Sequence, residues 1–324
     1  MAFLEIKDLQ VDYATDDGVV HALNGVDLEL FHGESLGLVG ETGAGKTTLA
    51  KCVLGLLPKR TARIHSGEIF YDGTDLLKAS EADMRKVRGA HIAMIFQDPM
   101  TSLNPVLTVG EQIAEAVENH EKCSSSQARA RAEEMLELVG IPAQRIDEYP
   151  HQFSGGMKQR VVIAIALACN PKLLIADEPT TALDVTIQAQ VLEMIQQLRE
   201  KFQTSMLLIT HDLGVVAQNC DRVAVIYAGE IVEYGTVRDV FKRMQHPYTK
   251  GLFTSIPQIH ADVKRLVPIQ GMMPDPTNLP AGCKFSTRCP YAEPRCHEER
   301  PVLYEVESGH MARCFRCEKG RCEK

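Results

Sequence analysis

A short segment near the N-terminus has the residue types and spacing needed to hold phosphate groups. Residues 40–47 read Gly-Glu-Thr-Gly-Ala-Gly-Lys-Thr and match the pattern G-x-x-x-x-G-K-[ST]. The glycines let backbone N–H groups approach the phosphates, Lys46 reaches the β and γ oxygens, and Thr47 ligates Mg²⁺. The predicted binding residues of this loop are Gly40, Thr42, Gly43, Ala44, Gly45, Lys46, Thr47 and Thr48. We therefore predict a site for a nucleoside triphosphate with Mg²⁺.

A second set of polar residues follows apolar, strand-like runs. Asp177 and Glu178 end the run that begins at Leu173, where the chain would leave the carboxyl edge of a sheet. Asp177 can hold Mg²⁺ through water, and Glu178 can orient or polarise an attacking water. A solvated strand end explains such acids equally well when they stand alone, but the phosphate loop favours the functional interpretation. His211 ends a third run, where a lone histidine is usually structural.

The elements that must position these residues alternate along residues 3–250. Mostly apolar, strand-like runs cover 35–39, 91–96, 172–177, 205–210 and 222–227, and helical stretches include 47–57, 126–140, 158–168 and 187–202. This alternation predicts an α/β domain with a largely parallel sheet, its strands buried on both faces. Residues 98–160 contain no strand-like run and predict a helical insertion.

The composition is that of a folded protein without a membrane span. Of the 324 residues, 44% are hydrophobic and 24% charged, which argues against disorder. The net charge of −8 argues against a general nucleic-acid binder. No apolar run approaches the ~18 residues that would cross a bilayer. The first residues include Glu5 and lack a basic region, so we expect no signal peptide and at most a peripheral membrane role.

The C-terminal tail differs in kind from the rest of the chain. After residue 255 prolines interrupt any periodicity, so we place a boundary between a domain at 1–260 and an extension at 261–324. The extension holds the cysteines 283, 289, 296, 314, 317 and 322. In a reducing compartment clustered cysteines hold metal more often than disulfides. Their chemistry alone leaves a [4Fe-4S] cluster, a zinc ion and free surface thiols open.

One further motif completes a set that resembles the ATP-binding cassette family. Residues 153–160 read Phe-Ser-Gly-Gly-Met-Lys-Gln-Arg, where the family signature is commonly L-S-G-G-Q. Ser154, Gly155 and Gly156 keep the core of that signature, and we expect the two changed positions to modulate function rather than abolish it. A Ser-Gly-Gly segment that opens a helix can bind an anion through bare backbone amides. The motifs follow the family's order along the chain, which is more specific than any one of them.

The resemblance implies a role for each matching position. Tyr13 resembles the aromatic residue that stacks on adenine, although a half-buried strand tyrosine is the alternative. Gln97 resembles the glutamine that contacts Mg²⁺ and water, and His211 the histidine that contacts the γ-phosphate. Asp184, in Thr181-Ala-Leu-Asp, resembles the loop that crosses a dimer interface. The implied catalytic residues are Lys46, Gln97, Glu178 and His211, and the implied Mg²⁺ ligands are Thr47, Gln97 and Asp177.

The resemblance also implies a fold and an assembly. The fold would be a P-loop NTPase cassette with a RecA-like, mostly parallel sheet, and residues 98–160 would be its helical subdomain. In this family two cassettes enclose two ATP molecules, each phosphate loop facing the other subunit's Ser-Gly-Gly. One chain here has one of each, so a dimer is implied. A groove in the helical subdomain would receive a membrane permease.

A closer resemblance concerns residues 91–105 and the extension from Gly271 to Cys314. These resemble the D-type ATPase subunit of dipeptide and oligopeptide importers, a group that also includes nickel importers. Some members carry a [4Fe-4S] cluster, which by position would bind Cys283, Cys289, Cys296 and Cys314. Zinc stays the alternative, because Cys314-Phe-Arg-Cys317 is a C-x₂-C pair and Cys322 follows it.

The function that this closer resemblance implies is ATP hydrolysis that powers peptide import. The implied partners are a second, F-type ATPase subunit, two permease subunits and an external peptide-binding protein, with this chain peripheral on the cytoplasmic face of the membrane. An importer of nickel or another small solute is the alternative. A soluble cassette ATPase that acts on nucleic acid or ribosomes is disfavoured by the net charge and by the single cassette.

Overall fold

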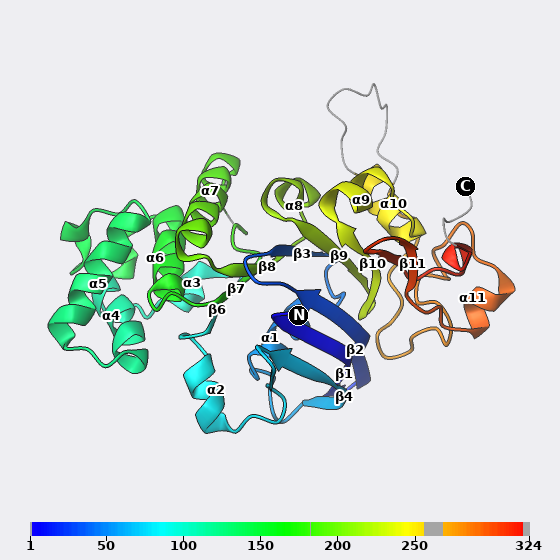
Figure 1. Ribbon diagram of the computed structural model, residues 1–324, viewed down its shortest axis with the longest axis horizontal. Coiled ribbons are helices and arrows are strands. Elements are labelled where there is room, and N and C mark those ends of the chain that lie inside the picture. Colours follow the sequence, from blue (N-terminus) through cyan, green and yellow to red (C-terminus); the bar gives the residue numbers. More distant parts are fainter. Residues whose placement is uncertain (1, 182, 256–267, 320–324) are drawn as a thin grey trace. The chain divides into compact units, whose positions relative to one another are not determined.

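The computed structural model describes residues 2–181, 183–255 and 268–319, and strands and helices follow one another throughout (Figure 1). These residues form two compact units. The first contains residues 2–30 and 36–77 together with the described residues from 210 to 319. The second contains residues 31–35 and 78–209. The expected α/β class is confirmed.

An antiparallel sheet opens the first unit. Its strands, in the order β2-β1-β4-β5, are β1 (Leu4–Thr15), β2 (Gly18–Leu30), β4 (Ala62–Tyr71) and β5 (Thr74–Asp75). One face of β1 is buried through Leu4, Ile6, Leu9 and Val11. Asp72 and Gly73 both have positive φ and join β4 to β5 by a two-residue turn, which makes the pair antiparallel. This sheet was not expected from the sequence.

The other strands of the first unit pair partly in parallel and partly in antiparallel fashion. These are β3 (Ser35–Val39), β9 (Arg222–Tyr227), β10 (Glu230–Thr236), β11 (Tyr304–Glu307) and β12 (His310–Ala312). Strands β3 and β9 pair in parallel, whereas β9–β10, β10–β12 and β12–β11 are antiparallel. Ala228 and Gly229, with φ of 46° and 77°, form the turn that reverses the chain after β9. The largely parallel arrangement predicted from the sequence therefore ends at β9.

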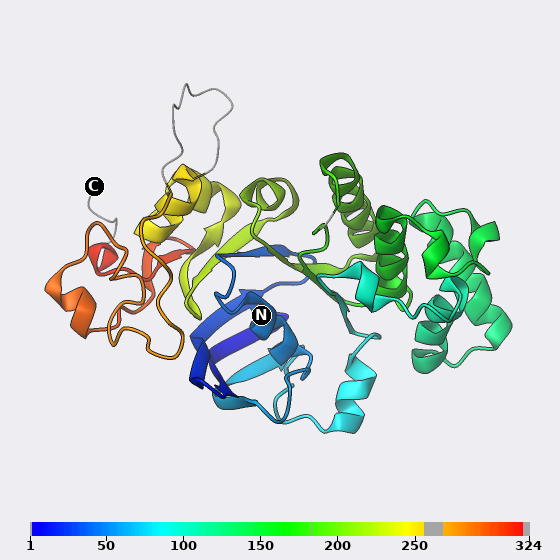
Figure 2. The same cartoon turned by 180° about the vertical axis from the view of Figure 1, so that it is seen from behind.

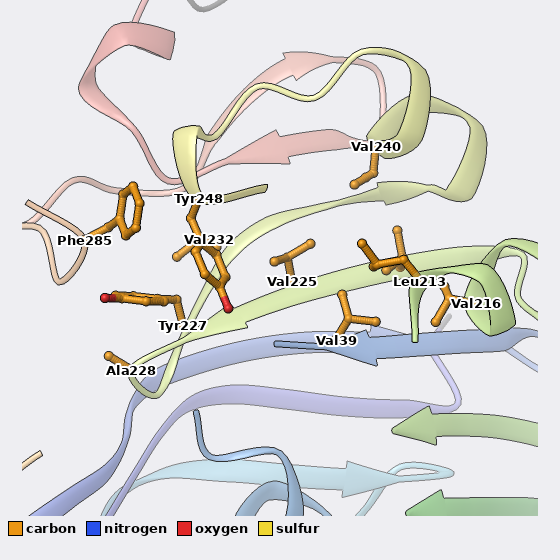
Figure 3. Close-up of a cluster of buried hydrophobic side chains, with 11 residues drawn as sticks. Val39, Leu213, Val216, Val225, Tyr227, Ala228, Val232, Val240, Tyr248 and Phe285 are labelled. Atoms are coloured by element: carbon orange, nitrogen blue, oxygen red, sulfur yellow. The ribbon is translucent and has the colours of Figure 1, made fainter. Parts of the chain in front are cut away.

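The helices of this unit and the C-terminal extension share one core. The helices are α1 (Lys46–Val53), α8 (Leu213–Asn219), α9 (Val237–Lys242), α10 (Pro247–Thr254), α11 (Pro294–Glu298) and η3 (Phe315–Cys317). Figure 2 shows the extension, in orange and red, beside α9 and α10, in yellow. Tyr227, Tyr248 and Phe285 point toward one another in the buried cluster that also holds Val39, the last residue of β3 (Figure 3). The extension is thus packed against Tyr227 of β9 and Tyr248 of α10.

Parallel strands and helices make up the second unit. Strands β6 (Ile92–Ile95), β7 (Leu173–Asp177) and β8 (Ser205–Thr210) pair in parallel in that order. All residues of β7 and β8 are buried, as expected for strands covered on both faces. The helices are α2 (Glu81–Val87), α3 (Pro99–Ser102), α4 (Val109–His120), α5 (Ser125–Leu138), η1 (Ala143–Arg145), η2 (Pro150–Gln152), α6 (Gly155–Leu167) and α7 (Val185–Phe202).

Residues 98–160 form helices wherever they form a regular element. Capping boxes set two of the helix starts: Thr108 with Glu111 begins α4, and Ser124 with Gln127 begins α5. The limits of the helical subdomain stay a prediction. So does the boundary after residue 260, because residues 256–267 lie outside the described part of the chain.

Candidate functional site

The predicted phosphate loop joins β3 to α1, and close backbone contacts fix its shape. A Cβ atom at Gly40 would lie 2.2 Å from the carbonyl oxygen of Ile226, so no larger residue fits there. Gly45 has a φ of +104°, and its Cβ would lie 2.6 Å from the carbonyl oxygen of Ala22. The buried Lys46 Nζ donates hydrogen bonds to the carbonyl oxygens of Gly40 (2.8 Å) and Glu41 (3.0 Å). The ammonium group of Lys46 is therefore enclosed by the backbone of the loop to which it belongs.

Other predicted residues of the loop differ in their exposure. Ala44 is buried, whereas Thr42 and Gly43 are exposed and Thr47 is half-buried. The hydroxyl of Tyr13, on β1, donates a 3.3 Å hydrogen bond to Thr48 Oγ1 in α1. The structure thus brings Tyr13 to the helix that follows the loop. Its stacking on adenine stays a prediction.

In the second unit, Gln97 and Glu178 meet at the carboxyl ends of neighbouring strands. Gln97 Nε2 donates a 3.0 Å hydrogen bond to Glu178 Oε2, and the Thr181 hydroxyl donates to the same oxygen at 2.9 Å. Glu178 has a φ of +47°, and its N–H donates to the carbonyl oxygen of Ile209 at 2.8 Å. Asp177, the last residue of β7, is 2% exposed. The arrangement holds one carboxylate oxygen of Glu178 at a fixed point.

The predicted signature residues lie at the start of α6. The exposed Ser154 is the N-cap, and its Oγ accepts a hydrogen bond from the Met157 N–H at 3.4 Å. A Cβ at Gly156 would lie 2.7 Å from Cγ2 of Ile187 in α7, so this glycine allows the two helices to pack closely. A Cβ at Gly155 would meet no atom of the other described side chains or loops within 4 Å. Gly155 therefore leaves backbone uncovered at a helix N-terminus, where anions bind.

Two further predicted residues lie beside helix starts. Asp184 caps α7, because its Oδ1 accepts a 3.0 Å hydrogen bond from the Ile187 N–H. Ala182, in the same predicted interface loop, lies outside the described residues. His211 is exposed and directly follows β8 in the sequence, one residue before Asp212 caps α8. The predicted roles of Asp184 and His211 in dimer and phosphate contacts stay predictions.

Comparison with known proteins identifies the family. A family model described as "ABC transporter" matches residues 23–181, and one described as "Oligopeptide/dipeptide transporter, C-terminal region" matches residues 232–296. The dipeptide transport ATP-binding protein DppD of Bacillus subtilis is 49% identical over 96% of this chain and 94% of its own length. The chain belongs to the ABC transporter family. The family and the ATPase activity predicted from the sequence are confirmed.

Other members of the ABC transporter family are similarly close. The oligopeptide transport ATP-binding protein OppD of Bacillus subtilis is 51% identical over 96% of this chain and 88% of that protein. The probable peptide ABC transporter ATP-binding protein y4tR of Sinorhizobium fredii is 52% identical over 97% and 94% of the two chains. Among solved structures, the ATP-binding cassette MJ0796 with ADP and Pi has a TM-score of 0.65 at 27% identity and covers 72% of this chain and 99% of its own.

Four of the cysteines in the extension line a single pocket. They are Cys283, Cys289, Cys296 and Cys314, the four that the resemblance assigned to a cluster, and both aromatic and polar residues also line the pocket. Burial raises the pKa of Cys283 to about 12 and also raises the pKa values of Cys289 and Cys314. Cys317 is disulfide-bonded, and Cys322 lies outside the described residues.

The arrangement of these thiols bears on the kind of metal group they could hold. Among the described residues, no three His, Cys, Asp or Glu side chains are grouped so that they could hold one metal ion. The described residues therefore support neither a zinc ion nor a cluster, and Cys322, the third cysteine of the zinc alternative, lies outside them. A [4Fe-4S] cluster differs from zinc, because each of its four thiolates binds a different iron atom. Four cysteines line the shared pocket, which is the number of thiolates that a cluster needs, and the cluster and zinc both stay predictions.

Within the described parts of the chain, no helix combines the length and the apolar character needed to cross a bilayer.

Proposed function

We propose that this chain is the ATP-hydrolysing subunit that powers the import of dipeptides or oligopeptides through an ABC transporter. The observation that carries the substrate class is the oligopeptide/dipeptide transporter region matched at residues 232–296. Relatives named for dipeptide and oligopeptide transport align with almost the whole chain, including the cysteine-rich extension, and support the same assignment.

In the proposed reaction, water attacks the γ-phosphorus of ATP in line with the departing ADP. The new bond joins the water oxygen to phosphorus, the bond to the β–γ bridging oxygen breaks, and ADP and inorganic phosphate leave. Glu178 orients the water and accepts its proton, and Gln97 and Thr181 fix the carboxylate that does so. Lys46 and the backbone amides of Gly43–Thr47 stabilise the charge on the phosphate oxygens.

Thr47 and Asp177 are the proposed holders of Mg²⁺. Their hydroxyl and carboxylate oxygens are hard donors of the kind that this ion prefers. When bound, Mg²⁺ supplies charge neutralisation at the β- and γ-phosphate oxygens.

A dimer is part of the proposal, because the chain has one phosphate loop and one Ser-Gly-Gly segment. The open backbone at Gly155 would face the ATP held by a second cassette, for which an F-type subunit is proposed. The groove of the helical subdomain would receive a membrane permease at the cytoplasmic face of the membrane, and the transporter would contain two permease subunits. An external binding protein would deliver the peptide.

A [4Fe-4S] cluster on Cys283, Cys289, Cys296 and Cys314 is proposed for the extension. The extension is rich in proline, and Val306 and Ala312 belong to a small apolar cluster among its described residues. A bound cluster would tie together segments that apolar packing holds weakly, as structural metals do in other small domains.

The function is tested by replacing the corresponding subunit in Bacillus subtilis. Strains lacking DppD or OppD would receive this chain, and uptake of labelled dipeptides, oligopeptides and nickel would be measured. We expect peptide uptake to return with the unmodified chain and not with E178Q at equal expression. Restored nickel uptake without peptide uptake would overturn the substrate class, and failure in both strains by a chain that binds to the membrane would overturn the importer role.

A further inference from the structure

The extension reaches the phosphate loop through one buried arginine. The side chain of Arg288 is 5% exposed and makes two hydrogen bonds to the carboxylate of Glu41, from NH1 to Oε2 at 2.8 Å and from NH2 to Oε1 at 3.1 Å. Its Nε donates to the carbonyl oxygen of Gln270 at 3.1 Å. A bidentate contact of this kind fixes the orientation of the carboxylate as well as its distance from the guanidinium.

Glu41 is the second residue of the phosphate loop, and its backbone is also engaged. Its N–H donates to the hydroxyl of Tyr248 at 3.0 Å, and its carbonyl oxygen accepts the hydrogen bond from Lys46 Nζ. One residue of the loop is therefore held by the extension and α10 and in turn holds the lysine that would contact ATP. A second contact lies at Gly43, where an added Cβ would be 3.2 Å from Cε of Met273.

The same arginine lies beside the cysteine-lined pocket. Arg288 directly precedes Cys289, and its guanidinium lies near the rings of Tyr227 and Phe285 at 5.8 and 6.0 Å. Phe285 also lines the pocket. The Tyr227 and Phe285 ring centroids are 5.2 Å apart, in the cluster drawn in Figure 3. A displacement of the Cys289 segment would therefore move the arginine that contacts Glu41.

We propose that Arg288 is a positioning residue, which sets the conformation of the phosphate loop through Glu41 and couples ATP affinity to the cysteine-lined pocket. The proposal rests on the proposed role of residues 40–47 as the ATP site. Removal of Glu41 would leave the buried guanidinium of Arg288 without its counter-ion, and removal of either partner would release the loop. Coupling between two sites is reciprocal, so bound ATP would also stabilise the extension.

The test is a double-mutant cycle on the full chain, read out as the dissociation constant of ATP by calorimetry. R288M and E41Q should each weaken ATP binding about fivefold or more, which is the lower end of usual coupling between sites. The dissociation constant of ATP for the double variant should be no larger than that for the single variant that binds ATP less tightly. This is expected because the two substitutions remove the same interaction. The ATP affinity of R288K should lie between those of the wild type and R288M, since an ammonium group cannot make the bidentate contact. Normal ATP binding by R288M, or single effects that multiply in the double variant, would overturn the proposal.

Two control variants distinguish the proposed role of Arg288 from the proposed assignment of residues 40–47 as the ATP site. R295M removes an exposed arginine of the same extension that pairs with Glu299 and Glu318, and ATP binding should not change. K46A should abolish ATP binding. If K46A binds normally, the assigned ATP site is wrong; if K46A fails and R288M binds normally, only the role of Arg288 is wrong. R288M should keep the wild-type circular dichroism, and if it does not fold, R288K and E41Q carry the test.

The link to the pocket needs one further variant. C289A should weaken ATP binding several-fold in the wild-type background and add nothing in R288M, since both changes act through the same contact. Unchanged ATP affinity in C289A would refute the coupling to the pocket, and an additional loss in the R288M background would show a route other than Arg288.

Discussion

Gln97 donates a 3.0 Å hydrogen bond to the carboxylate of Glu178 across 81 residues of sequence. The two residues meet because they follow β6 and β7, which pair in parallel with Ile95 opposite Ala176. Parallel strands bring their carboxyl ends to the same edge of a sheet, so the residues just beyond them are neighbours. The proposed water-orienting carboxylate is thus held by the side-chain amide of Gln97.

The first prediction concerns Glu178 itself. E178Q keeps the size of the side chain and a hydrogen-bonding oxygen but removes the base. We expect turnover of ATP to fall by about 100-fold or more, the usual contribution of a general base, with ATP affinity within about twofold of wild type. Steady-state hydrolysis and nucleotide-binding assays would check this. A mutant that hydrolyses ATP at the wild-type rate would remove Glu178 from the mechanism.

The second prediction concerns the pH dependence of Gln97 variants. Q97E places a carboxylate beside that of Glu178, and like charges raise the pKa of the group that must be ionised to act as a base. The acidic limb of the turnover profile should therefore shift to higher pH in Q97E. Q97A removes the amide without adding charge and should lower turnover with no such shift. Identical pH profiles for the two variants would contradict the contact between Gln97 and Glu178.

The sequence predicts those parts of the site that depend on local pattern. The loop between Val39 and Lys46, the buried run that ends at Asp177 and the start of α6 at Ser154 were all expected, because each combines a short motif with a strand or helix of its own. Glu178 and Gln97 follow strands that the apolar runs predicted. Asp184 shows a role that the motif did not suggest, because it also caps α7.

The N-terminal sheet that carries Tyr13 was missed because its alternation is broken. The pairing of β1 shifts register between Ile6 and Leu9, and Asp8 has a φ of 40° at that point. A bulge of this kind changes which residues face inward, so no regular period appears in the sequence. Asp72-Gly73 was the available signal, since Asp-Gly between apolar runs is typical of a two-residue hairpin.

The contact between Arg288 and Glu41 could not be predicted from a single amino-acid sequence. The two residues are 247 positions apart, and the charge of each is unremarkable for an exposed residue. Only the packing of the extension against Tyr227 and Tyr248 brings them together. Long-range pairing of this type depends on the folded arrangement, which local propensity does not encode.

The third prediction separates two adjacent glycines of the signature. G156A should lower the free energy of unfolding by about 1–3 kcal/mol, because the added methyl would press on Ile187. G155A meets no atom of its own chain and should leave stability unchanged or slightly higher. It should nevertheless impair ATP-dependent dimerisation, since the methyl covers backbone proposed to face the partner's ATP. Chemical unfolding and size-exclusion chromatography in the E178Q background would measure both, and ATP-dependent dimerisation of G155A at the wild-type level would refute that role.

The last prediction concerns the metal content of the extension. Protein purified without oxygen should contain about four iron and four acid-labile sulfide atoms per chain and show broad visible absorption. C283A and C314A should lose iron, whereas C123A, which changes a cysteine of the helical insertion, should keep it. The pocket predicts this difference because it is lined by Cys283 and Cys314 and not by Cys123. Zinc without acid-labile sulfide would contradict the cluster and would shift the expected ligands toward Cys314, Cys317 and Cys322.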